Sequence, residues 1–433
     1  MQNAWHNTQD RGMTNELYIK LNREPVGYIK HNPLDDTFAI ELYDKELHLS
    51  PHISSGSDSG AVKRFIMNLL PEGQGLEELS SMMHLSKSNV FGLIKAIGTE
   101  TTGALSFHAT QDEIEETSFR EIPEGELISR IKERSQTPIT IWDNKPRLSV
   151  AGVQEKLPVM INEQGVCGIG EGDLASTHIL KFGKNPDEHI VLNEHLCMTL
   201  AKRLNFPVAE TEILRLGEPV LKVKRFDRIN KGTTIDRLHI IDGCQMLDLP
   251  PSYKYERVYG DGRDVKDFRE GASLAKLFKV ATLCSVPAVA TRDILNWVLF
   301  NLIIGNCDAH GKNISWHYTG DEIRVTPFYD MLSISIYEKK YNQNLAMAIG
   351  DNFSSQIYAY DLAEMCEMCE LQSRFVARTL DKMAKVVLTE TDTLISGFTL
   401  VGNETDFMKK FVPLLKANAE WYIEVAKELP NIG

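Results

Sequence analysis

The stretch "TRDILNWVLFNLII", residues 291–304, is the sequence feature that most constrains the fold. A helix with this sequence would carry apolar side chains on nearly every side, so it must lie buried inside a domain. Thr291 is predicted to cap its N-terminus and Gly305 to end it. The apolar run is too short to cross a bilayer and contains Asn296 and Asn301, so we expect no membrane span.

The composition favours a cytoplasmic protein of two or three domains. The chain has 433 residues, of which 42% are hydrophobic and 25% charged, as in ordinary globular proteins. A net charge of −13 argues against a surface that binds nucleic acid as a whole, because phosphate binding requires clustered Lys and Arg. Seven widely spaced cysteines and a polar N-terminus without an apolar signal region favour a reducing compartment.

Short strand-like runs dominate the first half of the chain, and helical spacing dominates the second. This order predicts an α+β fold of two lobes, like that of protein kinases, with a cleft between a β-rich N-lobe and an all-helical C-lobe. The expected segments are a flexible tail (1–14), an extra N-terminal α+β subdomain (15–110), a linker (111–139), the N-lobe (140–245) and the C-lobe (246–433).

The polar residues that follow the apolar helix have an informative spacing. Asp308 and Asn313 in "NCDAHGKNIS" give the Asp-x-x-x-x-Asn arrangement of a kinase catalytic loop. There a carboxylate orients the acceptor hydroxyl, and the Asn oxygen binds a metal. Asp330 in "TPFYDMLS" would be the second Mg²⁺ ligand, and Lys312 would neutralise the transferred group. The motif alone would favour a turn or cap role for Asp308, so the interpretation depends on the combination.

Two further segments fit a nucleotide site. Lys181 in "THILKF" would hold phosphates and Glu194 in "NEHL" would pair with it, although Lys181 would also suit an edge strand facing water. "VLKVKRFDR" would supply a hinge at Lys224, Arg225 and Phe226 whose backbone binds adenine. Alternatively, the positive charges of this segment only face solvent and bind no nucleotide.

The segment "RLSVAGVQEK", residues 147–156, precedes a predicted hairpin. Its small residues would let backbone N–H groups approach phosphates, although the glycine-rich G-x-G-x-x-G pattern is absent. Ser149, two residues after Arg147, would then lie close to the γ-phosphate. We therefore consider Ser149 a candidate for self-phosphorylation, against the simpler alternative of an ordinary loop serine.

Two cysteine patterns are weak candidates for metal sites. Cys366 and Cys369 form a single C-x-x-C, and Cys307 with His310 would make half of a site. The sequence shows no second pair of metal ligands for either candidate. We expect Cys307 to pack beneath the loop and His310 to shape it.

The motifs together resemble a known family. "SVAGVQEK", "THILK", "NEHLC", "VKRFDR", "NCDAHGKNIS" and "TPFYDMLS" occur in the order seen in HipA-type serine/threonine kinases, the toxin components of bacterial toxin–antitoxin pairs. The resemblance runs from the N-terminal strands to about residue 350. Lys224 stands where the family usually has an acidic residue, and the N-terminal tail is longer than usual.

The resemblance implies a role for each matching residue. Asp308 would be the catalytic base, Asn313 and Asp330 the Mg²⁺ ligands, and Ser149 an inhibitory autophosphorylation site. The implied ATP contacts are Ala151, Gly152, Val153, Gln154, Glu155, Lys156, Lys181, Lys224, Arg225, Phe226, His310, Lys312 and Asn313.

The resemblance also implies partners and a target. A dimeric helix-turn-helix antitoxin would bind operator DNA with this chain as corepressor. The protein substrate would be a translation component such as glutamyl-tRNA synthetase, whose modification causes growth arrest and persistence. Two alternatives are a catalytically silent corepressor and a small-molecule kinase of the same fold.

Overall fold

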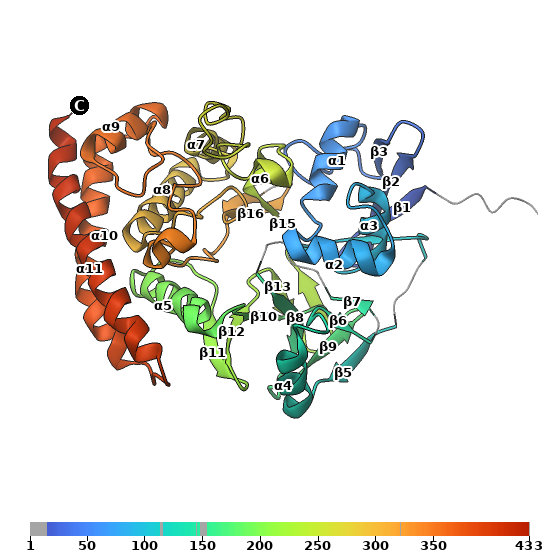
Figure 1. Cartoon of the computed structure of the whole chain (residues 1–433). Coiled ribbons are helices and arrows are strands. Elements are labelled where there is room, and N and C mark those ends of the chain that lie inside the picture. Colours follow the sequence, from blue (N-terminus) through green and yellow to red (C-terminus); the bar gives the residue numbers. More distant parts are fainter. Residues whose placement is uncertain (1–14, 113–115, 144, 148–153, 321, 433) are drawn as a thin grey trace, which may run out of the picture.

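The first half of the chain contains most of the strands together with shorter helices, and long helices fill the last third (Figure 1). The computed structural model describes residues 15–112, 116–143, 145–147, 154–320 and 322–432. The predicted tail (1–14), Ser149 and the positions Ala151, Gly152 and Val153 lie outside the described residues.

The N-terminal subdomain is an antiparallel sheet packed against helices. The sheet has the order β3-β2-β1-β4. Its strands are β1 (Glu16–Leu21), β2 (Glu24–Asn32), β3 (Thr37–Leu42) and β4 (Leu105–His108), and its helices are α1 (Ser59–Met67), α2 (Gly73–Met83) and α3 (Val90–Ile97). Leu17 and Ile19 alternate with polar residues along β1 and are fully buried, as expected for a strand with one face on a core.

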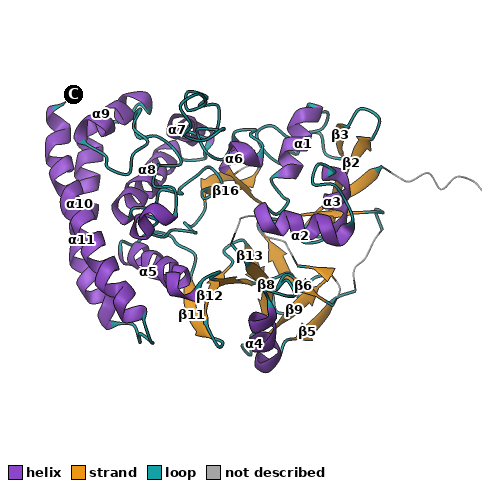
Figure 2. Cartoon of the chain, in the orientation of Figure 1, coloured by secondary structure: helices purple, strands orange, loops and turns teal. Residues whose placement is uncertain are grey.

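A second antiparallel sheet has the order β11-β12-β10-β8-β9-β5 among the described residues. These strands are β5 (Ser118–Glu121), β8 (Lys156–Ile161), β9 (Cys167–Glu171), β10 (His178–Phe182), β11 (Thr211–Arg215) and β12 (Pro219–Lys224). Helix α5 (Ile190–Arg203) connects β10 to β11 along the chain (Figure 2). Leu180 and Phe182 belong to a core on one face of the sheet, so Lys181 between them points to the other face.

The segment 111–139, predicted as a linker, is part of this second sheet. It contains β5, which pairs with β9, and helix α4 (Glu124–Glu133). Leu127 and Ile131 of α4 lie in the same buried cluster as Leu180. The many charged residues in the sequence of this segment concealed the narrow apolar stripe of α4. The other domain boundaries stay predictions.

The C-terminal region is mainly helical, with α10 and α11 side by side along one edge (Figure 1). Its helices are α6 (Gly243–Met246), α7 (Leu274–Val280), α8 (Pro287–Ile304), α9 (Ala359–Met368), α10 (Ser373–Ser396) and α11 (Glu404–Glu428). The predicted C-lobe (246–433) is not all-helical, because it contains β16 (Ser315–Thr319) and β17 (Glu322–Val325). These two strands form a small sheet with β15 (Ile240–Asp242).

The remaining elements are short. They are the strands β6 (Ile141–Trp142), β7 (Lys145–Pro146), β13 (Arg228–Asn230) and β14 (Ile235–Arg237), and the 3₁₀ turns η1 (Pro186–Glu188), η2 (Pro251–Tyr253), η3 (Ala281–Leu283), η4 (Ser335–Lys340) and η5 (Leu429–Asn431).

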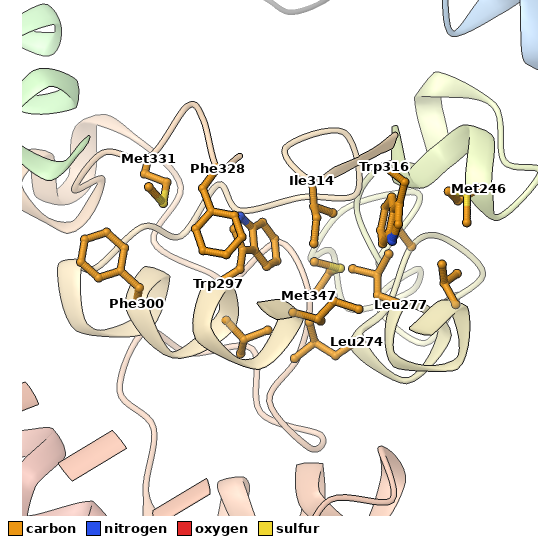
Figure 3. Close-up of a cluster of buried hydrophobic side chains, with 14 of the residues drawn as sticks. Met246, Leu274, Leu277, Trp297, Phe300, Ile314, Trp316, Phe328, Met331 and Met347 are labelled. Atoms are coloured by element: carbon orange, nitrogen blue, oxygen red, sulfur yellow. The ribbon is translucent and has the colours of Figure 1, made fainter. Parts of the chain in front are cut away.

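Helix α8 lies in the centre of the core, as its sequence predicts. Trp297 and Phe300 are buried among side chains from α7, β16 and the segment after β17 (Figure 3). The helix begins at Pro287 rather than at a Thr291 cap, because the fixed φ of proline suits the first helical turn. It ends at Gly305, in the left-handed conformation with φ of 68°, as predicted. Within the described residues, no helix is long and apolar enough to span a bilayer.

Truncating the buried face of α8 should destabilise the whole protein. We expect Phe300→Ala to lower the free energy of unfolding by about 3–5 kcal/mol, because it leaves a cavity in a close-packed core. Leu283→Ala, at a side chain that is 51% exposed, is the control and should cost less than about 0.5 kcal/mol. Urea unfolding of both variants measures the difference, and equal losses would contradict a central role for α8.

Candidate functional site

The loop that follows α8 is tied to that helix by a chain of buried amides. Asn301 donates from Nδ2 to the Trp297 carbonyl at 2.8 Å. Its Oδ1 accepts a hydrogen bond from Asn306 Nδ2 at 2.8 Å. Asn306 Oδ1 in turn accepts from the backbone N–H of Asp308 at 3.1 Å. The backbone of Asp308 is therefore fixed relative to α8, whose second half is almost entirely buried.

The carboxylate of Asp308 is held by a tyrosine that the sequence analysis did not single out. Tyr255 Oη donates to Asp308 Oδ1 at 2.7 Å. Burial and the nearby charge of Asp308 raise the pKa of Tyr255, so the phenol stays protonated and remains a donor. The Tyr255 ring meets the buried His310 edge to face, with centroids 5.2 Å apart. Burial lowers the pKa of His310, which accepts from the Lys312 N–H at 3.3 Å and so helps shape the loop.

Lys181, Glu194 and Asp330 meet in one cluster. Lys181 Nζ lies 2.7 Å from Glu194 Oε1 on α5 and 2.6 Å from Asp330 Oδ1, which follows β17. Strand β10 lies between β12 and β8, so Lys181 is not an edge residue facing water. Two carboxylates, 13 and 149 positions away along the chain, therefore converge on one ammonium group.

The charges in this cluster shift one another's pKa values. Burial alone would lower the pKa of Lys181, but Asp330 and Glu194 raise it above its usual value. Burial would raise the pKa of Asp330, but Lys181 lowers it to about 2. Burial raises the pKa of Glu194, and Lys181 opposes this effect. Lys181 and Asp330 are thus firmly charged, whereas the charge on Glu194 depends on its ammonium partner.

A second ammonium lies on the same face of the sheet. Lys156 on β8 is directly opposite Lys181 in the antiparallel register, so the two side chains point the same way. Burial and the charge of Lys181 lower the pKa of Lys156 to about 8. Two neighbouring residues that were predicted to contact ATP bind other parts of the protein. Glu155 pairs with Arg134 at 3.2 Å, and Gln154 donates to the Phe182 carbonyl at 3.2 Å.

Asn313 and Asp330 could hold a divalent cation. Asn313 Nδ2 donates to Asp330 Oδ2 at 3.2 Å, and turning the amide over would present its oxygen instead. One carboxylate and one amide oxygen suit Mg²⁺, which keeps several waters or phosphate oxygens as further ligands.

Across the described part of the chain, no group of three or more His, Cys, Asp or Glu is placed to hold a metal ion. The Cys366–Cys369 pair is thus not part of such a group, and Cys307 packs against Leu332 as expected.

Lys312 is not placed as predicted. Its Nζ contacts Asp242 Oδ2 at 2.5 Å, Asn68 Oδ1 at 2.9 Å and the Asn68 carbonyl at 3.3 Å. These contacts occupy all three N–H donors of the ammonium. Lys312 therefore points toward the N-terminal subdomain and not into the Lys181 cluster, because the acid closest to it is Asp242.

The predicted hinge combines an exposed and a buried cation. Lys224 is exposed beside Glu210, which fits the alternative that its charge only faces solvent. Arg225 is 5% exposed, and its guanidinium is held by Asp227 and Ser176. The charge of Arg225 therefore does not face solvent. The Phe226 ring lies 5.8 Å from that of Tyr329. Any contact of Arg225 with a nucleotide would therefore involve its backbone.

Comparison with known proteins gives matches along nearly the whole chain. The sequence model of the HipA-like C-terminal domain matches residues 148–390, and that of the HipA N-terminal domain matches residues 17–108. The serine/threonine-protein kinase toxin HipA of Shewanella oneidensis is 40% identical over 419 residues, which cover 94% of this chain and 96% of that protein. A putative kinase of Sinorhizobium fredii is 30% identical over 295 residues, covering 66% of this chain and 67% of that protein.

A solved structure is also similar to the whole fold. The structure of HipA from Shewanella oneidensis in complex with HipB and its operator DNA superposes with a TM-score of 0.89 at 39% sequence identity. The superposition covers 96% of this chain and 100% of that chain.

Removing the ammonium from the cluster should destabilise the protein in a pH-dependent way. We expect Lys181→Met to lower the free energy of unfolding by about 3 kcal/mol near neutral pH, because Glu194 is left buried without its partner. Burial already raises the pKa of Glu194, so its charged form is disfavoured in the folded state. The loss should therefore shrink as the pH falls from about 7 to about 5 and Glu194 takes up a proton.

The control is the double variant Lys181→Met/Glu194→Gln. It removes the unpaired charge of Glu194, so it should regain part of the stability and show a weaker pH dependence than Lys181→Met, although Asp330 has also lost its cation. Urea unfolding at both pH values tests this, and a loss in Lys181→Met that does not change with pH would be inconsistent with an unpaired Glu194.

Proposed function

Because this chain belongs to the HipA family, whose two domain models match most of its length, we propose that it is an ATP- and Mg²⁺-dependent protein serine/threonine kinase. The relative from Shewanella oneidensis that is 40% identical is named a kinase toxin of this type. The observation that carries the proposal is the convergence of Lys181, Glu194, Asp330 and Asn313, with Asp308 on the same loop as Asn313.

Asp308 is the proposed catalytic base. Tyr255 holds one of its two carboxylate oxygens, and the second would accept the proton of the acceptor hydroxyl. The amide chain through Asn306 keeps the backbone of this residue still. The barrier to transfer is then lowered by orientation rather than by a covalent intermediate.

Lys181 and Lys156 are the proposed phosphate-binding cations. Both lie on the face of the sheet that points toward Asp330, so their charges would offset those of a triphosphate. Asn313 and Asp330 would hold Mg²⁺, which when bound neutralises charge on the phosphate oxygens. The segment 151–156 and the backbone of residues 224–226 would complete the ATP site.

The proposed partners follow from the similar solved complex. That structure contains HipA, HipB and operator DNA, so we propose that this chain binds a dimeric helix-turn-helix antitoxin and represses transcription with it. The net charge of −13 supports contact with DNA mainly through the antitoxin. We propose a cytoplasmic protein substrate from the translation machinery, such as glutamyl-tRNA synthetase, and growth arrest as the consequence.

Replacing the catalytic base should abolish transfer without unfolding the protein. We expect Asp308→Asn to lower ATP-dependent phosphate incorporation about 10²–10⁴-fold, because the amide cannot accept the proton but can still accept the Tyr255 hydrogen bond. Asp406→Asn on α11, whose side chain is 72% exposed, is the control and should transfer phosphate like the parent. Undiminished transfer by Asp308→Asn would refute this assignment, and no transfer by the parent would favour the silent corepressor.

Self-phosphorylation at Ser149 is a separate part of the proposal. After incubation with ATP and Mg²⁺, the intact mass of the parent should increase by one phosphoryl group, and that of Ser149→Ala should not. Ser129→Ala, at an exposed serine on α4, is the control and should gain the same mass as the parent. Equal mass gains in all three proteins would exclude Ser149 as the modified residue.

A further inference from the structure

The N-terminal subdomain contacts the loop that carries Asp308. Asn68 and Glu72 lie between α1 and α2 of that subdomain. The side-chain and backbone oxygens of Asn68 both accept from Lys312 Nζ, at 2.9 and 3.3 Å. Glu72 Oε2 lies 2.8 Å from Lys254 Nζ. Two residues of the subdomain thus each bind a lysine that is close to Asp308.

These contacts form a buried group of alternating charges. The side chains of Lys312, Lys254 and Glu72 are 4%, 10% and 14% exposed. Burial would raise the pKa of Glu72, but Lys312 and Lys254 lower it below its usual value. Burial would lower the pKa of Lys312, but Asp242 and Glu72 raise it. Because each charge is stabilised by the others, removing one member leaves its neighbours poorly compensated.

Each lysine is connected to the loop that carries Asp308. The Lys254 carbonyl accepts from the backbone N–H of Gly311 at 2.9 Å, and the next residue, Tyr255, donates to the Asp308 carboxylate. Lys312 is itself part of the loop after α8, and its carbonyl accepts from Tyr329 Oη at 2.8 Å. The subdomain is therefore connected to the loop at two neighbouring points, at Gly311 through Lys254 and directly at Lys312.

Asn68 is itself rigidly held. It is 2% exposed, and its Nδ2 donates to the carbonyls of Arg64 at 3.0 Å and Leu249 at 2.8 Å. One hydrophobic core also continues from the subdomain into the helical region, since Phe65 and Trp297 belong to the same cluster. The contact with Lys312 thus connects two well-packed parts of the protein.

We propose that Asn68 and Glu72 are positioning residues for phosphoryl transfer, which act through Lys312 and Lys254 on the orientation of Asp308. The proposal rests on the kinase function above. It assigns the N-terminal subdomain a part in the chemical step, and it gives Lys312 a role in holding the loop instead of contacting the phosphate.

The same interface offers a matched control. Arg64 on α1 makes a bidentate ion pair with Asp248, at 2.9 Å and 2.5 Å. Their side chains are 33% and 26% exposed. This pair joins the same two parts of the protein, and neither side chain contacts the loop that carries Asp308 in the described structure. Arg64→Ala should weaken the interface and leave the loop in place.

The experiment compares full-length Asn68→Ala, Glu72→Ala, Glu72→Gln and Arg64→Ala with the parent. Steady-state phosphate incorporation gives kcat and the KM for ATP, and thermal unfolding gives Tm. We expect kcat to fall about 10–100-fold in Asn68→Ala and Glu72→Ala, because small displacements of a reacting group are costly. The KM for ATP should stay within about twofold, since the Lys181 cluster is untouched.

Two comparisons separate positioning from general stability. Arg64→Ala should lower Tm as Asn68→Ala does but keep kcat within about twofold of the parent. Glu72→Gln keeps an oxygen that can accept from Lys254, so its kcat should lie between those of Glu72→Ala and the parent. This variant also preserves the shape of the side chain, so it decides the question if Asn68→Ala does not fold.

Two results would overturn the inference. If Arg64→Ala loses as much kcat as Asn68→Ala and Glu72→Ala, or if all Glu72 variants match the parent, the subdomain has no specific effect on the loop while the kinase function stands. If the parent itself transfers no phosphate from ATP, the proposed function fails and the inference fails with it.

Discussion

The contact of Lys181 with Glu194 and Asp330 is the interaction on which the arrangement of the candidate site depends. It joins the middle of the large sheet to α5 and to the segment after β17. Withdrawing the charges of Lys181 and Glu194 from water is unfavourable, and their close approach to each other and to Asp330 compensates for it. The contact thus fixes the sheet against the helical region at the place where the proposed phosphate-binding groups lie.

The second requirement is a rigid support for Asp308, and α8 provides it. The helix is packed on most sides by large apolar residues, as Figure 3 shows for Trp297 and Phe300. It ends at Gly305, whose left-handed conformation and close approach to Ser335 leave no room for a Cβ. The loop therefore leaves the helix in one direction only, and the side chains that follow have little freedom to move.

Residues in local motifs were predictable from the sequence, and residues that act through long-range contacts were not. A lysine between apolar strand residues, a glutamate on the next helix and the Asp308–Asn313 spacing each have a local pattern. Asn68 meets Lys312 across 244 positions of the chain, and no periodicity or motif marks such a contact. Tyr255 lies close to Asp308 only because the loop before α7 folds back over Gly311. Likewise, local charge hid α4, whose burial depends on the sheet beneath it.

Asn301 shows that this core is not optimised for stability alone. A buried amide in the last turn of an apolar helix is less favourable than leucine would be, and it is tolerated because Trp297 and Asn306 satisfy its hydrogen bonds. A more apolar side chain would stabilise α8 but release Asn306, and with it the backbone of Asp308. Selection for heat resistance and selection for a working loop therefore oppose each other at this position, and thermostable variants should be sought elsewhere in the protein.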